Sequence, residues 1–405
     1  MSHFVAPARG PVRTLTVLGD EGLRLFFPLA AVHAALWPFL WVVVHGYDLP
    51  FAREVPPSLW HAHEMIIGSF GGALIGFITT AVPEWTDTPR PRGRPLFILA
   101  GLWGAARVAG SAGADLLGVV AAALDLAWLC GLLVFVARVS WRKRTTRLAA
   151  FLFWIGALTA AEAVIRYGFV TGDVALAQAA LRQGGFAFLA LLGLALARIT
   201  VPITNLVLDP TEATSPFRPH PGRLNLAAGL VALMMAGDLA GLSETTRAYL
   251  AIAAGAAFLD RTAEAFVGRG FFRGEILTLG GSSALAGLGL LLVGAARLGL
   301  PLPETSGLHV ALMGGLGLGV LGVFAIAGLL HTHQPLGLSR LTRVALLCLV
   351  ASVVLRIAPD LGADLAPSLA HGLASAVWAA AFLLWLAAYW PALSDPATLD
   401  KDSSC

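Results

Sequence analysis

Apolar stretches about 20 residues long recur along the whole chain, and this feature restricts the fold more than any other. A helix of that length crosses the hydrocarbon core of a bilayer. Only 13% of the residues are charged, whereas a soluble domain carries about 25%. Breaks at proline, glycine and charge divide the chain into expected spans at 24–46, 60–82, 95–113, 115–137, 148–170, 176–207, 224–243, 247–268, 275–299, 306–330, 341–358 and 368–393.

The membrane also determines the class of secondary structure. Lipid offers the backbone no hydrogen-bonding partner, so a spanning segment must be a helix or part of a closed barrel. The chain lacks the alternating apolar pattern of barrel strands. We therefore expect an all-α, polytopic membrane protein of about twelve transmembrane helices. No long polar insert divides the chain, so residues 1–405 are expected to form a single transmembrane domain.

The basic residues predict the orientation of the chain, because short cytoplasmic loops are enriched in Lys and Arg. In the twelve-span arrangement nearly all loop arginines, such as Arg90, fall on one side, while Arg53 and Arg247 fall on the other. Both tails, 1–22 and 394–405, are therefore expected in the cytoplasm. This distribution also explains the formal net charge of +3. We expect membrane lipid as the surroundings of this protein and no nucleic-acid partner.

The second span carries a stripe of small residues that begins with an acid: Glu64, Gly68, Gly72, Gly76 and Thr80. These residues recur at every fourth position and so lie on one face of a helix. Small residues at this spacing let helix backbones approach closely in lipid. We expect Glu64 to lie in a packed interface, away from lipid.

Two histidines at the start of the same span could bind a metal. His61 and His63 point about 200° apart on a regular helix, so they cannot both bind one ion there. Either they belong to two centres, or His61 lies in the preceding loop.

Two further histidines reach the same membrane face in the expected topology. His309 starts the tenth span and His371 lies in the first turn of the twelfth, while His33 lies deeper in the first. His309 and His371, together with His61 and His63, suit an axial ligand pair for heme, with or without copper. No CxxCH string is present, so a heme would be held non-covalently, as heme b is. The alternative is that each is an interfacial histidine bonded to water or a loop carbonyl.

His331 and His333 lie at the other end of the tenth span, about 33 Å from His309 by helix rise. They form either a second site or a solvated helix end. Arg107 and Arg198 lie within spans, where a guanidinium matches a heme propionate. The alternative for these arginines is snorkelling or pairing with acids such as Glu162.

Several strings resemble the NnrS family of bacterial membrane proteins. The most specific is LWHAHEMIIGSFGGALIGFITTAVPEWT, and LWGAARVAG, RITVPITN, GLHVALMGGLGLGVLG and LLHTHQPL extend the resemblance over nearly the whole chain. The family pattern RVxLGHTGRPL is AIAGLLHTHQPL here, so this chain is a divergent member around His331.

The resemblance implies a heme- and copper-containing protein of the bacterial inner membrane that takes part in nitric oxide metabolism or in defence against nitrosative stress. It places these positions in the site: His61, His63, Glu64, Arg107, Arg198, Asn205, His309 and His331. His61, His63, His309 and His331 would bind metal. Arg107, Arg198 and Asn205, together with His371, would bind the cofactor. Glu64 would take part in proton delivery. An enzyme of this kind would be an oxidoreductase that receives electrons from quinol or another respiratory donor.

Two other functions fit part of the sequence. One is a secondary transporter, because the segment around Asp260 and Arg261 resembles a loop of major facilitator proteins, although no two halves repeat. The other is a factor that delivers heme or copper to a respiratory oxidase. The sequence leaves the oligomeric state open.

Overall fold

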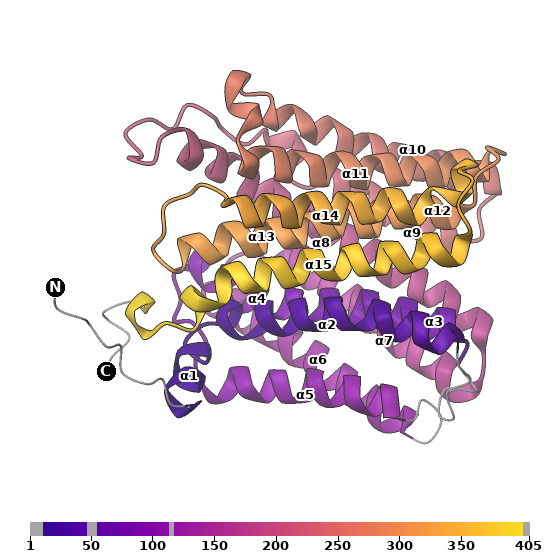
Figure 1. The fold of residues 1–405 in the computed structure, drawn as a ribbon, viewed down its shortest axis with the longest axis horizontal. Helices are drawn as coiled ribbons and strands as arrows, with labels where there is room; N and C mark the ends of the chain where they lie inside the picture. Colours follow the sequence, from indigo (N-terminus) through magenta and orange to yellow (C-terminus); the bar gives the residue numbers. More distant parts are fainter. Residues whose placement is uncertain (1–10, 47–54, 113–116, 400–405) are drawn as a thin grey trace.

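The computed structural model describes residues 11–46, 55–112 and 117–399, and every regular element in this part of the chain is helical (Figure 1). The α-helices are α1 (Pro11–Leu18), α2 (Gly22–Gly46), α3 (Pro57–His63), α4 (Phe70–Thr86), α5 (Arg94–Ala112), α6 (Gly118–Arg142), α7 (Ala149–Thr171), α8 (Val174–Leu208), α9 (Leu226–Leu239), α10 (Glu244–Arg261), α11 (Gly274–Arg297), α12 (Glu304–His309), α13 (Gly317–Leu330), α14 (Arg340–Ile357) and α15 (Pro367–Leu393). The all-α expectation is confirmed.

Eight helical stretches in the described residues are long and apolar enough to cross a membrane. They are Gly22–Leu40, Pro57–Thr86, Gly118–Arg142, Ala149–Thr171, Val174–Leu208, Gly274–Arg297, Glu304–Leu330 and Pro367–Leu393. The expected count of about twelve spans is therefore too high by length and composition. The other expected spans are helical, but α5, α9, α10 and α14 contain at most 19 residues. Charges at their ends, such as Glu244 and Arg261 in α10, shorten the apolar run further.

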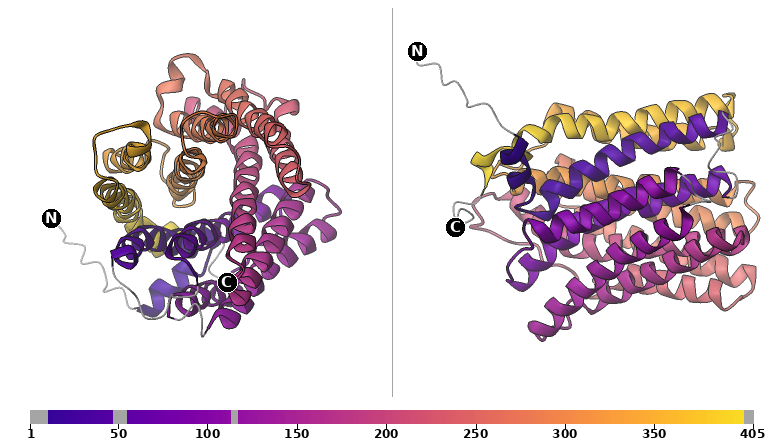
Figure 2. Two further views of the ribbon diagram at one scale, coloured as in Figure 1. Left: turned by 90° about the vertical axis from the view of Figure 1, so that its right-hand side faces the viewer. Right: turned by 90° about the horizontal axis from the view of Figure 1, so that it is seen from below.

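The long helices lie side by side and form one bundle, as the end-on view in Figure 2 shows. Helix α2 packs against α4 and α15, and α8 packs against α7, α9 and α11. The helices therefore bring the first and last parts of the chain together. One continuous cluster of buried apolar side chains runs from Leu18 to Leu393.

Arg24 joins both ends of the described chain at the end of the bundle where α1 lies (Figure 1). Its guanidinium donates to the carbonyls of Leu393 and His331, at 3.1 and 2.7 Å, and to the hydroxyl and carbonyl of Thr398. Only 2% of this side chain is exposed. A buried charge that satisfies several carbonyls fixes their positions. The last helix is thereby held against the first long one.

The expected stripe of small residues lies in an interface between helices. A Cβ at Gly68 would lie 2.5 Å from the His33 ring, and one at Gly76 would lie 2.9 Å from Phe26 Cβ. Both contacts are with α2. Glycine is therefore required for the close approach of α2 and α4.

Two π-helical turns interrupt otherwise α-helical segments. The first, Glu64–Ser69, joins α3 to α4, and the second, Val310–Leu316, joins α12 to α13. A π turn leaves carbonyls without their usual partner in the helix. Side chains of neighbouring helices satisfy them: the Trp103 indole donates to the carbonyl of Gly68 at 3.0 Å, and Ser282 donates to the carbonyl of Gly315 at 2.7 Å. The π turns are thus built into the packing of the bundle.

We predict that Gly72→Leu destabilises the bundle. A Cβ at Gly72 would lie 3.1 Å from Trp103 and 3.3 Å from Ala30, so a leucine must displace α2 or α5. Overpacking of this kind costs about 1–3 kcal/mol. A lower midpoint of thermal unfolding in detergent would confirm it. The matched control is Gly104→Leu, because Gly104 has nothing within 4 Å of its Cβ direction. Equal midpoints for the two variants would contradict the assignment.

Candidate functional site

Three polar clusters along the bundle contain most of the described histidines. The central charge network consists of His33, His63, Glu64, Arg107, Asp125, Glu162 and Arg166. The α3-end cluster consists of His61, His309, Arg356 and His371. The α1-end cluster consists of Glu21, Glu84 and His331. Each draws its members from segments that are far apart in the sequence.

His63 lies inside the central charge network, at the last position of α3. Its Nδ1 is 3.2 Å from Glu64 Oε1, and its Nε2 is 3.0 Å from Glu162 Oε1. The imidazole is fully buried. Both ring nitrogens are therefore occupied by carboxylates of the protein.

Two arginines complete the central charge network. Arg107 donates to Glu64 Oε1 at 2.7 Å and also to Asp125. Arg166 donates to Glu162 at 2.8 Å and to the other oxygen of Asp125. The carboxylate of Asp125 thus joins α5 to α7, and the indole of Trp128 donates a further hydrogen bond to it. None of the charged groups is more than 5% exposed.

The charges of this network do not cancel by themselves. Three carboxylates and two guanidiniums give a formal sum of −1: Glu64, Asp125, Glu162, Arg107 and Arg166. A buried charge is costly unless it is compensated. His63 contacts two of the three carboxylates, so one proton on its imidazole balances the network.

His33 extends the network toward α2. Its Nε2 is 3.2 Å from Glu64 Oε2, and its Nδ1 is 2.8 Å from the Ser69 hydroxyl. The rings of Trp37 and Trp103 contact the imidazole edge-on. The hydrogen-bonded chain therefore runs from Ser69 through both histidines and Glu64 to Glu162 on α7.

The α3-end cluster brings three histidines together. His61 points away from His63 and lies close enough to His309 and Arg356 for their charges to interact. His309 Nδ1 lies 2.7 Å from the carbonyl of Thr305, to which it donates. Arg356 donates to His371 Nε2 at 2.9 Å. The four expected histidines are therefore divided: His61, His309 and His371 lie in one cluster, and His63 lies in another.

The α1-end cluster lies at the opposite end of the bundle. His331 Nδ1 is 2.8 Å from Glu21 Oε1, and its Nε2 is 3.4 Å from Glu84 Oε1. A cavity of about 280 Å³ borders these residues and Asp20. Burial raises the pKa of Asp20 above its ordinary value. Arg90 donates to Glu21 at 2.5 Å, so part of the acidic charge is already compensated.

Arg198 and Asn205 lie outside all three clusters. The Arg198 guanidinium lies over the rings of Trp85 and Phe151 and donates to the carbonyl of Arg147. The Asn205 amide exchanges two hydrogen bonds with the backbone of Phe217, at 3.0 and 3.1 Å. In the structure these two side chains therefore bind other groups of the protein, in helices and in loops.

Comparison with family models gives a match to the NnrS protein family over residues 17–397. The chain belongs to the NnrS family. This family is linked to the nitric oxide response. No curated protein matches the chain significantly. The match confirms the resemblance found in the sequence. It does not by itself identify a cofactor.

The polar clusters of this NnrS protein offer different ligand atoms, so they are not equally suited to hold a cofactor. His63 does not fit a heme ligand, because carboxylates face both of its nitrogens. His309 fits one, because a metal-binding imidazole usually donates its other nitrogen to a carbonyl. Within the described residues, two groups have ligand atoms within 4.8 Å of one another: Glu21, Glu84 and His331, and His63, Asp125 and Glu162. Either group could hold a small metal ion.

Sequence reasoning missed Asp125, Glu21 and Glu84. Asp125 is an acid inside an apolar stretch, and such a residue in a membrane usually faces a partner. The sequence alone therefore shows that Asp125 needs a partner within the protein. Its contact with Arg107 and Arg166 depends on how three helices pack, which the sequence pattern does not encode.

We predict that Arg107→Met destabilises this NnrS protein strongly, because it leaves three carboxylates facing one guanidinium. Removing one partner of a buried ion pair costs about 3–5 kcal/mol. Denaturant titration in detergent measures the loss. The control is Arg223→Met, since Arg223 and Asp260 form a pair at the surface in which the two side chains are 23% and 47% exposed, and exposed pairs contribute about 0–1 kcal/mol. A loss for Arg107→Met as small as for the control would show that the network is not structural.

Proposed function

We propose that this NnrS-family protein binds heme at the α3 end of the bundle, with His61 and His309 as protein ligands, and that it acts in the response to nitric oxide. Copper bound by the same imidazoles is part of this proposal. The observation that carries it is the orientation of His309. Its Nδ1 is engaged by Thr305, so Nε2 is available to a metal.

The two ligands come from helices that are joined to π turns. His61 belongs to α3 and His309 ends α12, and these two helices lie at the same end of the bundle (Figure 1). A π turn rotates the residues around it and is frequent at functional sites. The imidazoles of two helices can then approach one metal from different directions.

Arg356 and His371 supply the surroundings that a heme needs. A guanidinium binds a propionate through paired hydrogen bonds, and Arg356 already donates to His371 at 2.9 Å. We assign Arg356 to the propionate or to an anionic ligand, and His371 to positioning this arginine. Arg107 is not assigned to a propionate, because Glu64 and Asp125 occupy its donors.

A bound heme iron or copper ion would supply redox chemistry with nitric oxide. Electrons would come from quinol or another membrane donor. The chain of His33, Glu64 and His63 supports a role for Glu64 in moving protons, because alternating imidazoles and carboxylates are the usual proton relays in membranes. His63 would remain within this relay.

The test compares single histidine variants of the purified protein. His61→Ala and His309→Ala are expected to lose the Soret band or the bound copper, because each removes one ligand. His333→Ala is the matched control, since His333 is exposed at the opposite end. Absorption spectra and metal analysis measure the result. Full heme and metal content in both variants would sink the proposal, and a substoichiometric metal in the native protein would favour a delivery factor.

We also propose that the protein lies in the bacterial inner membrane with both termini in the cytoplasm. The support is that α1 and the segment Pro396–Thr398 are in contact at one end of the bundle, and that loop arginines gather at that end. Green fluorescent protein fused to either terminus should fluoresce, and alkaline phosphatase fused there should be inactive. Active phosphatase at one terminus would contradict this orientation.

A further inference from the structure

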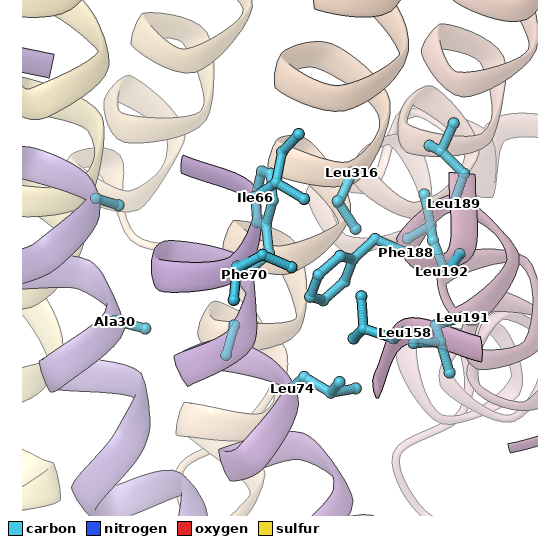
Figure 3. Close-up of a cluster of buried hydrophobic side chains, with 14 of the residues drawn as sticks. Ala30, Ile66, Phe70, Leu74, Leu158, Phe188, Leu189, Leu191, Leu192 and Leu316 are labelled. Atoms are coloured by element: carbon cyan, nitrogen blue, oxygen red, sulfur yellow. The ribbon is translucent and has the colours of Figure 1, made fainter. Parts of the chain in front are cut away.

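A small cavity lies between α4, α8 and α13, and none of the residues that line it belongs to the three polar clusters. Its volume is about 60 Å³, and only apolar residues line it, among them Phe70, Leu74, Phe188, Leu192 and Leu316. Figure 3 shows Phe70, Phe188 and Leu316 facing one another where the three helices meet. The rings of Phe70 and Phe188 are 6.1 Å apart and tilted.

The lining restricts what can occupy this space. Water needs about two to four polar partners in a buried site, and no lining side chain offers one. Apolar cavities of this kind stay dry and bind apolar atoms such as xenon. The volume also excludes large ligands, because pockets for drug-sized molecules measure about 300–1,000 Å³. A porphyrin or a quinone ring is therefore too large.

The cavity is placed close to the α3-end cluster. Phe70 follows the first π turn and lies nine residues after His61, and Leu316 ends the second π turn and lies seven residues after His309. Seven residues of helix correspond to about 10 Å. The segments that continue from α3 and α12, the helices of His61 and His309, thus form two walls of the cavity, about two to two and a half turns deeper in the bundle.

We infer that this cavity binds a small uncharged gas of two or three atoms, nitric oxide being the one to which the family is linked. Such a molecule has little need of hydrogen bonds and dissolves in the lipid around the bundle. The cavity gives it a defined site inside the protein, next to the helices of the α3-end cluster. The choice of nitric oxide rests on the proposed function, whereas the binding of a small gas in the cavity does not require heme.

Xenon tests the inference directly, because it is an uncharged probe of similar size that is easily located. Crystals of the full-length protein pressurised with xenon should show an anomalous peak between Phe70 and Leu316. Ala195 lines the cavity, so Ala195→Phe should abolish this peak. Ala105→Phe, on the exposed face of α5, should keep it. Nitric oxide at saturation should displace the bound xenon.

A second variant tests the inference if Ala195→Phe does not fold. Phe77 also lines the cavity, so Phe77→Ala enlarges it and should raise the xenon occupancy. No peak in the native protein, or an unchanged peak in Ala195→Phe, would overturn the inference. Because no heme takes part in the measurement, loss of the xenon site and loss of the Soret band are separate results.

Discussion

The carboxylate of Asp125 lies between two guanidiniums from neighbouring helices, and the packing of α5, α6 and α7 depends on this interaction. A single charge inside a bilayer costs about 3 kcal/mol or more. Arg107, Asp125 and Arg166 are therefore acceptable only together, in the arrangement that pairs them. The network fixes how α5, α6 and α7 are rotated relative to one another. It also places Glu64 and Glu162 on the two sides of His63.

The same local design occurs twice in the chain with different outcomes. A short helix ends at a histidine, a π turn follows, and a longer helix continues, first around His63 and again around His309. In the first copy the imidazole is enclosed by two acids. In the second, the hydrogen bond of the imidazole within the described residues goes to the carbonyl of Thr305. The neighbours on other helices, rather than the local backbone, thus decide whether such a histidine holds charge or is available to a metal.

The sequence predicted the helical class and the position of every spanning helix, because length and hydropathy are local properties of the chain. It also predicted that His61 and His63 point in opposite directions, which follows from helix geometry alone. It did not predict the π turns or the partners of Asp125. These depend on contacts such as the one between Trp103 and the carbonyl of Gly68, which form only when distant segments pack. The count of spans was too high for a similar reason, since hydropathy alone does not show how many residues a charged helix end removes from the apolar run.

A metal at the proposed site would interact with the central charge network through their charges. His61 and His63 are two residues apart on one helix, which is about 3 Å along its axis. Their side chains point to opposite sides of the helix, so the charges are further apart than this axial rise, but charges on two sides of one helix still interact in a medium of low dielectric constant. An electron added to a metal at His61 would therefore make a proton in the network more stable. The formal sum of −1 among the five permanently charged groups is balanced by one proton on His63, so the network is suited to respond to such a change. This coupling is a physical reason for a protein to place a metal-binding histidine and the buried His63 and Glu64 within one turn of a helix.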